Sequence, residues 1–147
     1  MSWFNYYGLI AVVIILIPNI ICAITDKTAY ENSFNNRFFI IAEQIGRYGC
    51  MAFMVFNIHY TYFNFWFGCA LYVYLAVNGA LLVFYCLGWI IFRKSRGVAK
   101  AVWLSVTPSA IFLFSGIMLT SVLLIACAVI FSVAHITISV KNAQKSD

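Results

Sequence analysis

Residues 8–25 read GLIAVVIILIPNIICAIT, an apolar run without a charged side chain. A helix needs about 20 mostly apolar residues to cross the hydrocarbon core of a bilayer. The run ends at Asp26 and Lys27, and no Lys or Arg precedes it, which is not typical of a cleaved signal peptide. We therefore expect residues 8–25 to form a retained transmembrane helix.

Three later stretches have the same apolar character. They cover residues 37–58, 65–92 and 108–140, and short polar or aromatic segments separate them. Pro108 suits the first turn of the last stretch, because its missing N–H has no helical partner there. Short links make consecutive helices antiparallel. The sequence therefore predicts an all-α fold, an antiparallel bundle of four transmembrane helices that forms one integral membrane domain over residues 1–147.

The composition excludes several other classes of protein. Hydrophobic residues make up 65% of the 147 residues and charged residues only 9%, whereas soluble domains average about 25% charged. A chain of this size cannot bury so many apolar side chains inside a soluble fold. A disordered protein, a disulfide scaffold and a nucleic-acid binder are excluded as well, because they need more polar, cysteine-paired or basic sequences.

The basic residues predict how the chain is oriented in its membrane. Lys and Arg near helix ends stay on the cytoplasmic side, where anionic lipid head groups attract them. With four spans, the segments 26–36 and 93–107 share one side and carry most of these residues. We therefore expect both segments to be cytoplasmic and both termini to lie outside a plasma membrane or bacterial inner membrane. The densest basic cluster is expected to contact anionic lipid; it comprises Arg93, Lys94, Arg96 and Lys100.

Two charged residues fall inside the second predicted helix. Glu43 and Arg47 stand four residues apart, so their side chains share a helix face and can pair. A charge at this depth costs on the order of 3 kcal/mol or more and turns toward protein or water. We therefore expect the pair to face the interior of the bundle.

Other polar residues are expected at similar depths on the neighbouring helices. Asn19 lies at about the depth of Glu43 and is its expected partner, and Asn78 lies near the level of Arg47. Gln44 follows Glu43 in the chain. The sequence thus predicts one polar centre that binds a substrate or ion, made of Asn19, Glu43, Gln44, Arg47 and Asn78.

No metal or cofactor is expected. His59 and His135 are both expected near the outer boundary of the membrane, where two imidazoles could bind a metal or sense pH. A zinc site needs three or four protein ligands, and no third ligand accompanies them, so interfacial histidines are the favoured interpretation. The spacings Gly46-x-x-Gly49 and Gly116-x-x-x-Thr120 favour close approach of helices.

Three functions of different classes remain open. The favoured one is an oligomeric transporter or channel for a small polar or charged solute, in which Arg47 and the solute, or a proton, compete for Glu43. The second is a non-catalytic accessory or sensory subunit whose Glu43–Arg47 pair orders the bundle. The third is an enzyme acting on a lipid or thiol substrate, with Arg47 as anion anchor and Tyr74 or Tyr85 as proton donor. No sequence motif of a nucleotide-binding, zinc-protease or serine-hydrolase site is found.

Overall fold

The computed structural model describes residues 3–25, 36–56, 67–92 and 97–144. Within these residues the chain is all-helical, and each of its helices is long and apolar enough to cross a membrane. The prediction of an all-helical fold is confirmed, and the helices have the length and composition of membrane spans. The described residues contain five such helices rather than four, namely α1 (Tyr6–Thr25), α2 (Arg37–Val55), α3 (Ala70–Ile91), α4 (Val98–Met118) and α5 (Val122–Gln144).

The first three predicted helices correspond to α1, α2 and α3. A capping side chain marks the start of α2. The Asn36 side chain accepts a hydrogen bond of 3.1 Å from the backbone N–H of Phe38 and caps the first turn of the helix. The last two residues predicted for the second helix, 57–58, and the first two predicted for the third, 65–66, lie outside the described residues. Apolar composition therefore located these three helices correctly.

The prediction of a single fourth helix over residues 108–140 is wrong. A helix of that length would extend roughly 50 Å, while the hydrocarbon core is about 30 Å thick. The chain forms α4 and α5 instead, and α4 begins at Val98 in a segment predicted to be a loop. Pro108 therefore lies in the middle of α4 and not in its first turn.

Two serine hydroxyl groups near Pro108 donate to carbonyl groups of the preceding turn of α4. The Ser105 hydroxyl donates to the Ala101 carbonyl at 2.6 Å, and the Ser109 hydroxyl donates to the Ser105 carbonyl at 2.7 Å. Proline is tolerated inside membrane helices more readily than inside soluble ones. Pro108 is buried, so it lies on the face of α4 that packs against the other helices.

The reversal between α4 and α5 takes only three residues. Thr120 has a φ of 53°, the left-handed conformation that often ends a helix. Its N–H donates to the Ile117 carbonyl at 3.1 Å, and the N–H of Ser121 donates to the Gly116 carbonyl at 3.0 Å. This pair of bonds is a Schellman motif. The Ser121 hydroxyl then accepts from the N–H of Leu124 at 3.3 Å and caps α5.

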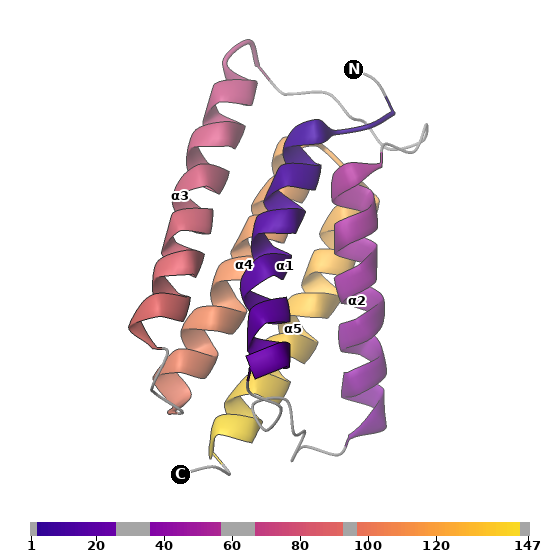
Figure 1. Ribbon diagram of the computed structural model, residues 1–147. Helices are drawn as coiled ribbons and strands as arrows, with labels where there is room; N and C mark the ends of the chain where they lie inside the picture. The colour runs from indigo at the N-terminus through magenta and orange to yellow at the C-terminus, as the bar shows by residue number, and fades with distance from the viewer. Residues whose placement is uncertain (1–2, 26–35, 57–66, 93–96, 145–147) are drawn as a thin grey trace.

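The five helices form a closed ring. Helix α5 packs along both α2 and α4, α4 packs against α3, and α1 contacts α2 and α3 on the remaining side (Figure 1). Consecutive helices run antiparallel, so α1 begins at one end of the bundle and α5 finishes at the other. The prediction that both ends of the chain share one side required an even number of helices and does not fit this arrangement.

The reversal gives a first testable prediction. A β-branched residue in the left-handed region costs about 1–2 kcal/mol, and glycine removes that cost. Thr120→Gly should therefore raise the free energy of unfolding of the purified protein in detergent by about 1 kcal/mol. Thr120→Ala is the matched control, because alanine keeps the Cβ atom and should give no such gain. A destabilised Thr120→Gly variant would contradict the assigned turn.

Candidate functional site

The predicted pair of charged residues on α2 is present in the structure. The Arg47 guanidinium donates from Nη2 to the Glu43 Oε1 atom, one helical turn away. The Glu43 side chain is only 7% exposed, whereas that of Arg47 is 33% exposed. The carboxylate is therefore buried in the protein, and the guanidinium remains within reach of a molecule outside it.

His135 of α5 is the second partner of the same carboxylate oxygen. Its Nδ1 atom lies 2.8 Å from Glu43 Oε1, and its ring stacks on that of Phe131 with centroids 4.7 Å apart. The sequence placed His135 at the outer boundary, because residues 108–140 were expected to form one helix. The reversal at Thr120 brings α5 back through the membrane beside α2, so His135 lies at the depth of Glu43. His59 lies outside the described residues.

The expected contact between Asn19 and Glu43 is replaced by another. The Asn19 amide donates to the Tyr85 hydroxyl of α3 at 2.9 Å and to the Ile15 carbonyl of its own helix at 2.9 Å. Tyr85 is 1% exposed and lies close enough to Arg47 for electrostatic interaction. These residues and Arg47 lie about 9–15 Å, by helix rise, from the same end of the bundle. We call them the Glu43 cluster: Asn19, Glu43, Arg47, Tyr85 and His135.

Asn78 and Gln44 are not joined to the Glu43 cluster. Asn78, 4% exposed, accepts a hydrogen bond of 3.3 Å from the Ser115 hydroxyl of α4, nearer the opposite end of the bundle. Gln44 is half-buried on α2, one position round the helix from Glu43. The buried rings of Phe112 on α4 and Phe131 on α5 pack edge to face, with their centroids 5.6 Å apart. Of the five residues predicted to form one polar centre, the structure therefore groups Asn19, Glu43 and Arg47 and places Asn78 and Gln44 apart from them.

Close packing of α2 on α5 holds Glu43 and His135 together. A Cβ atom added to Gly46 would lie 2.7 Å from the backbone nitrogen of Phe131, and one added to Gly49 would lie 2.5 Å from the Cys127 sulfur. The glycine spacing predicted such close approach of two helices. Because α2 meets the backbone of α5 here, His135, one turn after Phe131, reaches the Glu43 carboxylate.

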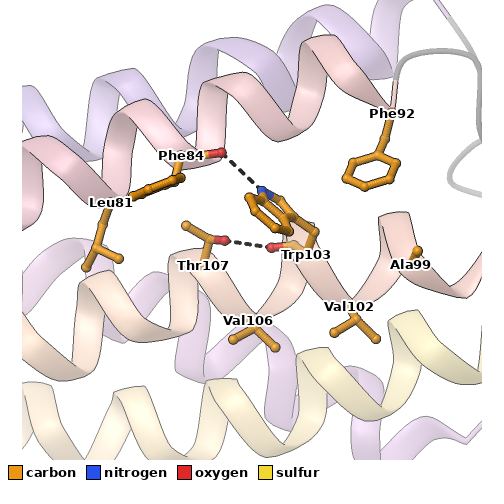
Figure 2. A pocket seen from close by; sticks show the side chains of 8 residues that line it. All are labelled: Leu81, Phe84, Phe92, Ala99, Val102, Trp103, Val106 and Thr107. Atoms are coloured by element: carbon orange, nitrogen blue, oxygen red, sulfur yellow. Dashed lines mark hydrogen bonds between the residues drawn. The ribbon is translucent and has the colours of Figure 1, made fainter.

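An apolar groove lies between α3 and α4, near the end of the bundle where α4 begins (Figure 2). Its volume is about 680 Å³. The Trp103 indole N–H donates to the Phe84 carbonyl at 3.1 Å and ties the two helices together across it. Nearby, the ammonium of Lys100 lies 5.8 Å from the centre of the Trp89 ring. The groove thus offers an apolar surface beside a basic residue.

Comparison of the chain with protein-family models, with curated proteins and with solved structures finds no match. In the part of the chain that the structure describes, no three His, Cys, Asp or Glu side chains gather as metal ligands. The Glu43 cluster instead combines one carboxylate, one guanidinium and one imidazole, which suits charge binding and proton exchange.

The contact at Gly46 gives the second prediction. Gly46→Ala should lower the free energy of unfolding by about 1–3 kcal/mol, because the added methyl group meets the backbone of α5, which cannot rotate away. Gly79→Ala is the matched control, since a Cβ atom there meets nothing within 4 Å. Denaturation of both purified variants in detergent measures the difference. Equal stability of the two variants would show that α2 and α5 are not packed as described.

Proposed function

We propose that the protein is a small membrane transporter that moves an anionic solute together with a proton through the Glu43 cluster. The observation that carries the proposal is that Arg47 and His135 share one buried carboxylate oxygen. An ionisable group within a membrane helix is by default a candidate for a substrate, ion or proton pathway. The homo-oligomer expected from the sequence stays a prediction.

Charge balance favours a proton and an anion as the joint cargo. At rest the Glu43 carboxylate neutralises the Arg47 guanidinium, so the pair carries no net charge inside the membrane. A proton taken up by Glu43 would leave Arg47 unpaired, and a bound anion would then neutralise it. Both states are neutral, which avoids the cost of an isolated charge at this depth. Arg47, a third exposed, is the group that an arriving anion would meet.

His135 is suited to handling the proton. A neutral imidazole donates its Nδ1–H to the ionised carboxylate, and the same nitrogen can accept from the protonated carboxyl group after a change of tautomer. The His135 side chain is 21% exposed, more than that of Glu43. It can therefore pass a proton between the surroundings and the buried carboxylate.

The orientation proposed for the bundle follows from its five helices. Arg37, Lys100 and Lys141 lie at the end of the bundle where α2 and α4 begin and α5 finishes. Every other Lys or Arg except Arg47 lies, by sequence, in a segment joined to this same end. Basic residues stay on the cytoplasmic side. We therefore place this end and the C-terminus in the cytoplasm and the N-terminus outside. Residues 93–100 would meet anionic lipid there.

The transport proposal predicts the effect of neutralising the carboxylate. Glu43→Gln keeps the size of the side chain and an acceptor oxygen but cannot cycle a proton, so proton uptake driven by an anion gradient should fall about tenfold or more. The measurement uses vesicles containing the purified protein and a pH-sensitive dye, with inward gradients of chloride, nitrate, sulfate or inorganic phosphate. At least one of these anions should drive protons inward through the unmodified protein.

A matched control is Glu31→Gln, which neutralises an acid outside the described helices and should leave the flux unchanged. Arg47→Gln should abolish the dependence on the anion. Two outcomes would overturn the proposal. The first is that none of the four anions stimulates proton movement, and the second is that a well-folded Glu43→Gln variant keeps full activity. The second outcome would favour a structural role for the pair in an accessory subunit.

The orientation gives a separate prediction. In a variant without the five native cysteines, Ser2→Cys should react with a membrane-impermeant maleimide only from outside, and Lys145→Cys only from the cytoplasmic side. Right-side-out and inverted membrane vesicles provide the two sides. Labelling of both positions from one side would mean an even number of spans and would contradict the five-helix topology.

A further inference from the structure

A second polar site lies in the wall of the bundle, away from the Glu43 cluster. A pocket of about 200 Å³ opens between α1 and α3. Its lining is mainly apolar and aromatic and includes Ile10, Ala11, Leu75 and Leu82. A Cβ atom added to Gly79, which also lines the pocket, would meet nothing within 4 Å, so this wall borders open space.

The wall of this apolar pocket contains a buried amide group that has an unpaired donor among the described residues. The Asn78 side chain lines it and is 4% exposed. Its Oδ1 atom accepts from the Ser115 hydroxyl, but its Nδ2 atom has no hydrogen-bond partner among the described residues. A buried donor without an acceptor is destabilising, because it has lost its hydrogen bond to water. A ligand with an acceptor oxygen would remove that cost.

The surroundings of Asn78 define the chemistry of the ligand. The lining is mainly apolar, its polar groups are the Asn78 amide and the hydroxyl groups of Tyr7 and Tyr74, and no charged side chain lines it. An anion or a cation would be unpaired there, which is costly inside a membrane. The pocket therefore suits an uncharged acceptor, such as a carbonyl oxygen, carried on an apolar molecule that reaches it from the lipid.

The depth of Asn78 separates two sources of such a carbonyl group. Asn78 follows the start of α3 at Ala70 by eight residues, roughly 12 Å along the helix. This places the donor nearer the middle than the edge of a hydrocarbon core about 30 Å thick. The ester carbonyl groups of a phospholipid are held at the edge by the charged head group. A lipid-soluble molecule without a charged head group can bring its oxygen deeper.

We propose that the pocket between α1 and α3 binds an uncharged lipid-soluble carbonyl compound, of the prenylated quinone or long-chain ketone class, through a hydrogen bond from Asn78. The volume accommodates the carbonyl-bearing head, and the apolar chain extends into the lipid between the helices. Tyr7 and Tyr74 also line the pocket and pack beside the head. This site is independent of the transport proposed for Glu43.

Photolabelling of the full chain in phosphatidylcholine vesicles tests the proposal. One probe is a prenylated benzoquinone with a diazirine on its chain, and the other is a phosphatidylcholine with a diazirine on an acyl chain. The quinone probe should label peptides of α1 and α3 about tenfold more than the exposed face of α5, as expected for one added hydrogen bond and a fitted pocket. The phospholipid probe should show no such preference.

Two variants remove different parts of the site. Asn78→Leu removes the donor at similar volume, and Gly79→Leu fills the pocket from a position with free space; each should reduce quinone labelling of α1 and α3 about tenfold. Gly68→Leu is the matched control, because Gly68 also has nothing within 4 Å but does not line the pocket. Labelling of the α5 face should stay constant in all variants.

Three outcomes would overturn the proposal. Quinone labelling that is equal on α3 and α5 would mean that the molecule only dissolves in the lipid. Labelling that survives both Asn78→Leu and Gly79→Leu would place it elsewhere. Labelling of the pocket by the phospholipid probe alone would assign the pocket to bulk lipid.

Discussion

The reversal from Gly116 to Ser121 determines the rest of this structure. Two backbone hydrogen bonds close the end of α4, and the Ser121 hydroxyl opens α5 three residues later. Because the turn is so short, the two helices must lie side by side and antiparallel. The turn therefore makes the number of helices among the described residues odd and places the start of α1 and the end of α5 at opposite ends of the bundle. It also directs α5 back along α2, which brings His135 to Glu43.

The sequence located helices well where one physical rule decided the outcome. Hydrophobic length defined α1, α2 and α3, and the four-residue spacing of Glu43 and Arg47 fixed their contact. The reversal was missed because Thr and Ser are tolerated inside membrane helices, where their hydroxyl groups bond to the preceding turn. The length of the run was the available signal, since residues 108–140 are too long for one crossing. The capping role of Ser121 could be recognised only after that limit was applied.

Side-chain partners were harder to predict than depths. Asn19 does lie at the depth expected from the end of its helix, yet it contacts Tyr85 instead of Glu43. Depth follows from counting residues along one helix, whereas a partner depends on which helices are neighbours. The ring order places α1 between α2 and α3, so Asn19 can turn to either one. The separation of Asn78 from Glu43 has the same cause.

Helix α1 connects the two polar sites of the bundle. Most of its large side chains face outward, and contact with lipid is as favourable for them as contact with protein. Polar bonds therefore carry much of its attachment: Asn5 donates to the Met54 carbonyl of α2 at 3.2 Å, and Asn19 donates to Tyr85 of α3. The first bond ties α1 to α2 near one end, and the second ties it to α3 near the other. Between them α1 closes the ring beside the Glu43 cluster and forms one wall of the Asn78 pocket. Helix α1 is therefore the structural element that the Glu43 cluster and the Asn78 pocket have in common.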